Sequence, residues 1–232
     1  MVSGRSLAAA ASMACACLGI GWPAGLPDAV AAPSLGEVVD KVQETCARAQ
    51  DLSAHFEQII TIRSINQEQR ANGILLLKRP RKMRWEYQQP EPRLFVTDGK
   101  TLWAYSPADK QVVVQGVDEA FASRLPISIL VGDCQLRRDF EITEVGNAAT
   151  RGSATSRVLD LKPKRPEAGI ARMLLEVTLR TYTLERITVF DLSGNTTVYA
   201  LTDLKLNPGL SDQQFTFVPP AGVTVVTPPK QP

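Results

Sequence analysis

Few residue types that carry out catalysis or bind metals occur in this sequence. It contains one histidine, His55, and four cysteines. A Ser-His-Asp or Cys-His site needs its histidine beside a nucleophile, and nothing near His55 marks one. The cysteines lack the paired spacing of zinc sites, and there is neither a G-x-S-x-G elbow nor a phosphate-binding glycine loop. We therefore expect no catalytic site, no metal and no cofactor, and we expect His55 at the surface.

A basic run at Lys78–Arg84 is the sharpest charge feature of the chain. The whole chain carries 26 Lys and Arg against 24 Asp and Glu, a formal net charge of +2. This near-balance argues against a nucleic-acid binder, which usually has a strong basic excess. Three roles remain for the run. It is a solvated connection between strands, a contact for anionic lipid headgroups, or a source of arginine donors for the backbone carbonyls of an overlying helix.

The elements that position these residues begin with a predicted helix. Ser34 is suited to cap it, and Glu37 three residues later completes a capping box. Apolar residues then recur at helical spacing, at Leu35, Val38, Val39, Val42 and Cys46. Such a stripe must pack against the rest of the chain, either as an ordinary core helix or as a lid.

After the helix the apolar period changes from 3.6 to 2, which predicts strands over 52–62, 74–78 and 83–88. The expected apolar faces of these strands carry Phe56, Ile60, Leu75, Leu77, Met83, Trp85 and Tyr87. A slip of one residue in register would exchange the two faces of a strand, so the alternation alone does not decide which face is the inner one.

The rest of the chain also reads mainly as strands. They are expected at 94–97, 101–105, 111–115, 140–145, 157–161, 171–179, 184–191, 196–205 and 215–217. A second helical region starts near Asp118 and is broken by Pro126, so 127–131 is a separate turn or short helix. About eleven strands with two helical interruptions predict a mainly β, antiparallel domain whose sheet curls on itself or is covered.

Residues 1–31 have the pattern of a secretory signal peptide. Arg5 supplies the positive charge, Leu7–Trp22 is uncharged and rich in alanine, and Ala29-Val30-Ala31 is a small-residue cleavage site. We expect cleavage between Ala31 and Ala32, which leaves a single domain, 32–232. No later segment has the roughly 20 apolar residues of a membrane-spanning helix. The mature chain is therefore expected in an exported, aqueous compartment.

Two of the cysteines, Cys15 and Cys17, lie inside this signal, where the positions three residues earlier are not aliphatic as a lipoprotein signal would require. Cys46 and Cys134 remain in the mature chain, in a compartment that permits disulfides. They either pair or are two buried, small apolar side chains. The sequence leaves both readings open.

Four stretches resemble the outer-membrane lipoprotein carrier (LolA) family. They are Leu52–Gln58 (LSAHFEQ), Leu77–Trp85 (LKRPRKMRW), Val96–Pro107 (VTDGKTLWAYSP) and Phe215–Val223 (FTFVPPAGV). Their order and spacing are similar to the family pattern over roughly residues 35–225. The resemblance implies an incomplete, strongly curved antiparallel barrel whose open mouth is covered by a lid of short helices. The predicted first helix and the 118–131 segment suit that lid.

The resemblance also implies a role and partners. A member of this family accepts acylated lipoproteins from an ATP-driven (ABC-type) inner-membrane extractor, carries them through the periplasm and gives them to an outer-membrane acceptor. Arg79 matches the family arginine that bonds to the lid and closes the empty cavity. The seven apolar strand residues given above would line the acyl-chain cavity. Met83 stands where the family often has phenylalanine, so this chain departs from the family pattern at that position. We expect a monomer that binds no nucleic acid.

Three rival functions share this scaffold. An outer-membrane acceptor would itself be a lipoprotein, which the cysteine context of the signal disfavours. A sensor of mislocalised lipoproteins would usually carry a second domain, for which the chain has little length. A carrier of free lipid or glycolipid would rely on the same nondirectional apolar contacts.

Overall fold

The structure is a computed structural model that describes residues 32–118, 134–147, 155–165 and 169–228. The predicted signal peptide and all but the first residue of the expected 118–131 lid segment lie outside the described residues. Within them, no helix combines the length and the apolar character needed to span a bilayer. Every element below belongs to one unit, Pro33–Pro232.

Helix α1 spans Leu35–Arg48, as the sequence predicts. Ser34 accepts a hydrogen bond from the amide of Glu37, and the Glu37 carboxylate accepts one from the Ser34 amide at 2.7 Å, which confirms the capping box. These bonds satisfy two amides that the first turn leaves unpaired, and they lower the pKa of Glu37. The helix buries one stripe, Val38, Val39 and Val42.

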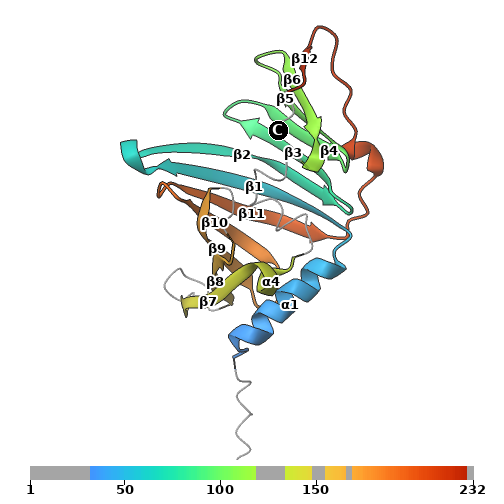
Figure 1. Ribbon diagram of the computed structural model, residues 1–232. Coiled ribbons are helices and arrows are strands. Elements are labelled where there is room, and N and C mark those ends of the chain that lie inside the picture. Colours follow the sequence, from blue (N-terminus) through green and yellow to red (C-terminus); the bar gives the residue numbers. More distant parts are fainter. Residues whose placement is uncertain (1–31, 119–133, 148–154, 166–168, 229–232) are drawn as a thin grey trace, which may run out of the picture. The chain divides into compact units, whose positions relative to one another are not determined.

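In the described part of the chain, twelve strands form one sheet. They are β1 (Asp51–Ile62), β2 (Gln67–Lys78), β3 (Lys82–Gln89), β4 (Arg93–Asp98), β5 (Thr101–Ser106), β6 (Gln111–Gly116), β7 (Phe140–Asn147), β8 (Ser156–Pro163), β9 (Ile170–Thr178), β10 (Leu184–Asp191), β11 (Thr196–Leu206) and β12 (Thr224–Val226). Their order is β12-β6-β5-β4-β3-β2-β1-β11-β10-β9-β8-β7. Because β12 and β7 are the two ends and do not pair, the sheet is open (Figure 1).

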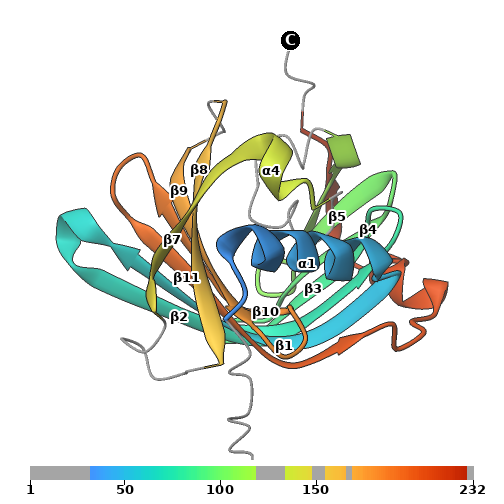
Figure 2. The ribbon, with the colours of Figure 1, turned by 90° about the horizontal axis from the view of Figure 1, so that it is seen from below.

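The sheet is strongly curved, and α1 lies across its concave side, as Figure 2 shows. The short helix α4 (Leu136–Asp139) lies beside α1. The predicted class, a mainly β, open and strongly curved sheet, is therefore confirmed. The longest pairing joins β1 to β2, from Asp51↔Lys78 to Ile62↔Gln67. The two strands are connected by the 3-10 turn η1 (Arg63–Ile65), so the loop is shorter than the sequence suggests.

Two predictions about the C-terminal part are wrong. Of the expected strand 215–217, Phe215 is the last residue of the 3-10 helix η3 (Asp212–Phe215), which Ser211 caps together with Gln214, and the next two residues form neither helix nor strand. The last strand, β12, lies further along and pairs with β6 in parallel, from Thr224↔Gln111 to Val226↔Val113. The sheet is thus not wholly antiparallel. The local capping bonds at Ser211 outweigh the alternating Phe-x-Phe pattern that favoured a strand.

Two buried clusters line the concave side of the sheet. The aliphatic cluster lies on β7–β10 and includes the whole buried stripe of α1. Its buried members are Val38, Val39, Val42, Leu136, Phe140, Leu159, Leu161, Ile170, Met173, Leu175, Val177, Ile187 and Val189. The aromatic cluster lies mainly on β1–β5 and β11. Its buried members are Ala54, Phe56, Leu75, Leu77, Met83, Trp85, Leu102, Val117 and Leu201.

The convex side of β3–β5 is covered by the C-terminal segment. Helix η3 contacts β3 and β4, and Phe215 is fully buried. The ring of Phe217 lies 5.4 Å from that of Tyr105 on β5. Asp212 receives ion pairs from Lys78 at 2.7 Å and Lys82 at 2.9 Å. These bonds lower the pKa of the Asp212 carboxyl to about 2.

Candidate functional site

Aromatic rings from four strands meet on the concave side of the sheet. Phe56 of β1 lies edge-on to Trp85 of β3, with 5.3 Å between ring centroids, and to Tyr87 at 5.0 Å. Tyr199 of β11 lies 5.4 Å from Trp85, and Phe95 of β4 lies 6.0 Å from Tyr87. Edge-to-face contacts at these separations are favourable. The aromatic cluster thus forms a continuous apolar wall.

Gly73 allows these rings to approach one another across β2. It pairs with Phe56 on one side and with Tyr87 on the other. A Cβ at this position would lie 1.9 Å from the Glu86 carbonyl oxygen and 2.9 Å from the Phe56 ring. The strand therefore needs a residue without a side chain here, and the space above Gly73 is filled by its aromatic neighbours.

The structure places six of the seven predicted wall residues together. Phe56, Leu75, Leu77, Met83 and Trp85 are buried in the aromatic cluster, and Tyr87 packs against it. Ile60 is not part of either concave cluster. It pairs with Gln69 and Thr197 near the far end of the β1–β2 hairpin, where its neighbours are polar.

Sequence reasoning missed several residues of this wall, among them four on strands that supplied no predicted wall residue. These four are Phe95 on β4, Leu102 on β5, and Tyr199 and Leu201 on β11. Each belongs to an alternating strand pattern that the sequence displays. The pattern does not say which of its two faces points inward. The register supplies that information, because Phe56 pairs directly with Leu201.

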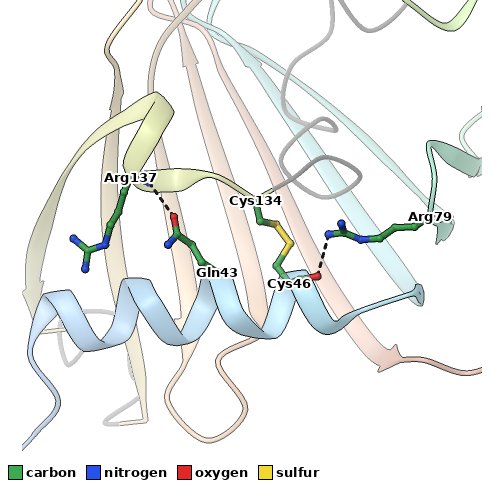
Figure 3. Close-up of a disulfide and its surroundings, with 5 residues drawn as sticks. All are labelled: Gln43, Cys46, Arg79, Cys134 and Arg137. Atoms are coloured by element: carbon green, nitrogen blue, oxygen red, sulfur yellow. Dashed lines mark hydrogen bonds between the residues drawn. A yellow bond between two sulfur atoms is a disulfide. The ribbon is translucent and has the colours of Figure 1, made fainter.

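Helix α1 is held over the sheet at several points, and Figure 3 shows the disulfide, the Arg79 bond and the bond that the Arg137 amide donates to Gln43 Oε1 at 3.0 Å. Near its C-terminus, Cys46 forms a disulfide with Cys134, and Arg79 Nη2 donates to the Cys46 carbonyl oxygen at 3.1 Å. Nearer its N-terminus, Arg137 of α4 donates to Asp40 at 2.7 Å and to the Gly36 carbonyl at 2.9 Å. The contact with Asp40 raises the pKa of Arg137.

The predicted lid arginine and the two mature cysteines therefore meet at one place in the structure. The basic run around Arg79 serves mainly as a set of ion-pair and hydrogen-bond donors. Lys78 and Lys82 bind Asp212, and Arg81 pairs with Asp118 at 2.7 Å. Asp118 is the one residue of the expected second lid segment that lies within the described range.

A cavity lies beneath the C-terminal half of α1, between the two clusters. Its lining comes from α1, the ends of β1, β2, β10 and β11, and the disulfide; the residues include Val42, Cys46, Leu52, Leu77, Arg79, Cys134, Leu175, Leu184, Leu204 and Leu206. Its volume is about 70 Å³. Pockets that hold small molecules measure about 300–1,000 Å³. The cavity beneath α1 is therefore several times smaller than a pocket that holds a small molecule.

The residues with catalytic potential are not gathered at this site. His55 is exposed and pairs on β1 with Thr202 and Ile74, between buried Ala54 and Phe56, so it points to the convex side. Among the described residues, no group of three His, Cys, Asp or Glu side chains is placed to hold a metal ion.

Comparison with known families decides the identity. The family model described as "Outer membrane lipoprotein carrier protein LolA" matches residues 47–218. The chain belongs to the LolA family. The match takes in β1, the aromatic cluster, Arg79 and Cys134, and it begins one residue after Cys46.

Curated members of the LolA family are similar over most of the chain. The outer-membrane lipoprotein carrier protein of Dechloromonas aromatica is 31% identical over 188 residues, covering 81% of this chain and 86% of that protein. That of Methylobacillus flagellatus is 32% identical over 175 residues, covering 75% and 82%. The description of these LolA relatives is that of a carrier and does not name a reaction.

A solved structure supports the fold alone. An uncharacterized conserved protein from Thermus thermophilus is similar with a TM-score of 0.53 and 18% identity. The likeness covers 84% of this chain and 100% of that one. The open curved sheet of this LolA family member therefore also occurs in the Thermus thermophilus protein, whose sequence is only distantly similar.

Proposed function

We propose that this protein is a periplasmic chaperone that binds the acyl chains of lipoproteins and carries them to the outer membrane. The observation that carries the proposal is the concave aromatic wall beside a helix that one disulfide and a few hydrogen bonds hold over the sheet. Membership of the LolA family supports it. Partners that fit this role are acylated lipoproteins, an ABC-type extractor in the inner membrane and an acceptor in the outer membrane.

The physical need for such a carrier is large. Each acyl methylene removed from water is worth about 0.8 kcal/mol. Three acyl chains in water would therefore cost tens of kcal/mol. An apolar wall repays this cost without recognising the protein part of the cargo, because apolar contacts are nondirectional. One cavity can then accept lipoproteins of many sequences.

In the mechanism we propose, the empty carrier is closed by α1. Arg79 and Arg137 hold the helix by hydrogen bonds that can be broken and remade. Entering acyl chains displace the lid and gain contact with the aromatic cluster. Release requires only an acceptor with more favourable apolar contact, so the carrier itself performs no catalysis and binds no nucleotide. It acts as a monomer after cleavage between Ala31 and Ala32.

The test is extraction from membranes. Inner-membrane vesicles with the extractor and a radiolabelled triacylated lipoprotein are mixed with the purified protein and ATP. We expect label in the soluble fraction, bound to the protein, and none with an unacylated cargo. No soluble label with an active extractor would overturn the proposal. Uptake of free lipid without uptake of lipoprotein would establish a free-lipid carrier instead.

A further inference from the structure

The aromatic wall contains one polar atom without a partner. Trp85 is 4% exposed. Its indole nitrogen, Nε1, is buried and is the one buried side-chain nitrogen or oxygen that lacks a hydrogen-bond partner in the part of the chain that the structure describes. Most buried polar side-chain atoms in proteins have a partner, so each exception calls for an explanation.

The register explains why the sheet offers this nitrogen no acceptor. Trp85 pairs with Leu75 on β2 and with Phe95 on β4, so both direct cross-strand neighbours are apolar. Gln58 Nε2 beside this wall already donates to the Tyr199 hydroxyl at 2.9 Å. The wall therefore satisfies one polar contact internally and leaves the Trp85 donor unused.

Few chemical groups could serve as the hydrogen-bond partner of Trp85 Nε1. An indole N–H is a donor only, so the partner must be an acceptor. It must also be carried into an apolar wall on a group that is itself mainly hydrocarbon. The carbonyl oxygen of an acyl ester or amide meets both conditions, because it is the first acceptor at the root of an acyl chain.

We propose that Trp85 Nε1 donates a hydrogen bond to an acyl carbonyl oxygen of the bound cargo. The inference rests on the proposed function and adds a polar anchor to it. The anchor would place the root of one acyl chain at β3 and direct its tail along the aromatic cluster. It would let the carrier favour acyl esters and amides over plain hydrocarbon.

A contact with an aromatic ring is the competing explanation for the same nitrogen. Phe56 and Tyr199 both lie edge-to-face with Trp85, at 5.3 Å and 5.4 Å. An N–H directed at a ring face makes a weak bond. In that case the nitrogen would take no part in recognition, and esters and alkanes of equal length would be bound alike.

The experiment compares methyl laurate with dodecane as probes of the full chain. Trp85→Phe removes the donor and keeps an aromatic ring, so any loss of packing affects both probes equally. We expect wild-type protein to bind the ester roughly fivefold more tightly than the alkane, the usual size of one net hydrogen bond. In the variant this ratio should fall to about one. Trp103→Phe is the matched control, because Trp103 lies on the opposite face of β5 from Leu102.

A spectroscopic readout accompanies the affinities. The indole N–H resonance that disappears in Trp85→Phe belongs to Trp85. It should move downfield with methyl laurate and not with dodecane. An unmoved resonance, or an ester-to-alkane ratio that Trp85→Phe leaves unchanged, overturns the anchor while acyl binding stands. Wild-type protein that binds neither probe would overturn the acyl-carrier proposal together with the anchor.

Discussion

The two halves of the concave surface differ in composition and in what they contact. The aliphatic cluster on β7–β10 contains the whole buried stripe of α1, Val38, Val39 and Val42. The aromatic cluster on β1–β5 contains no residue of α1. It holds instead the rings of Phe56 and Trp85, with Tyr87 and Phe95 packed against them, while Tyr199 packs against both clusters.

This difference indicates that the two halves of the concave surface have different roles. Aliphatic side chains that interlock with a helix hold it in one defined closed position, since closely packed groups fit in few arrangements. Large rings provide much apolar area with few rotatable bonds, which suits contact with variable chains. We infer that the aliphatic half seats the lid and that the aromatic half meets the cargo. The cavity beneath α1 lies where the two halves join.

The largest expected effect comes from removing the covalent tie of the lid. The disulfide closes a loop between two cysteines that are 88 residues apart in the sequence, and replacing Cys46 and Cys134 by serine opens this loop. The chain-entropy estimate for such a loop is about 4.6 kcal/mol of unfolding free energy. Urea unfolding of the double variant should show this loss, while acyl binding by the aromatic half persists. A loss below about 1 kcal/mol, or abolished binding in a folded variant, would contradict the division.

The next largest effect is expected from a substitution, Gly73→Ala, that disturbs the packing of the aromatic half alone. Gly73→Ala places a Cβ 1.9 Å from the Glu86 carbonyl oxygen, so the backbone of β2 or β3 must shift. We expect a loss of about 3 kcal/mol, the upper part of the range for overpacking, with reduced acyl binding. Gly36→Ala in α1 is the matched control. Its Cβ would meet Arg137 at an ordinary 3.5 Å, so the melting temperature should not fall. Equal melting of both variants would refute the role of Gly73.

A smaller effect on cargo transfer is expected from losing the hydrogen bond between Arg79 and α1. Arg79→Leu removes the hydrogen bond from the residue after β2 to the Cys46 carbonyl, which is worth about 1 kcal/mol. The lid should close less readily, and transfer of bound lipoprotein to an acceptor should slow by roughly fivefold. Arg70→Leu is the control, because Arg70 is an exposed arginine of β2 that pairs with Glu68. Transfer at the wild-type rate in Arg79→Leu would remove Arg79 from the mechanism.

The smallest effect lies outside the comparison, on the convex side. The ion pairs with Lys78 and Lys82 hold the pKa of Asp212 at about 2, below its ordinary value of 3.8. Folding is therefore favoured by this group above pH 4, and the contribution is lost as pH falls toward 2. Because Asp212 is exposed, the effect is small. We would follow the unfolding of wild type and Asp212→Asn by Tyr and Trp fluorescence at a series of acid pH values. The stabilities of the two proteins should differ above pH 4 and converge near pH 2. Identical stabilities at every pH would refute the contribution of Asp212.

Much of this arrangement could be predicted from local sequence signals. The capping box of α1 depends on Ser34 and Glu37 alone, three residues apart. The alternating strands of β3 and β8–β11 were predicted to within a few residues, because a half-buried strand must alternate. The basic run and Pro80 correctly separate β2 from β3.

What the sequence could not supply depends on distant partners. The strand β12 has three residues and exists because β6 offers an open edge. Tyr199 joins the wall because the register between β11 and β1 turns its face of β11 toward the concave side. A slip of one residue would turn the other face inward. The isolation of Trp85 Nε1 depends on Leu75 and Phe95 both lying opposite it. None of these neighbours is local in the chain.

The division of the concave surface can be tested by cross-linking a bound lipoprotein that carries a radiolabelled acyl chain. A photoreactive residue replaces Tyr87, which packs against the aromatic cluster, or Ile142, which packs against the aliphatic cluster. We expect the label to be captured at position 87 and not at position 142. Capture at position 142 alone, or equally at both, would contradict the assignment of the aromatic half to the cargo.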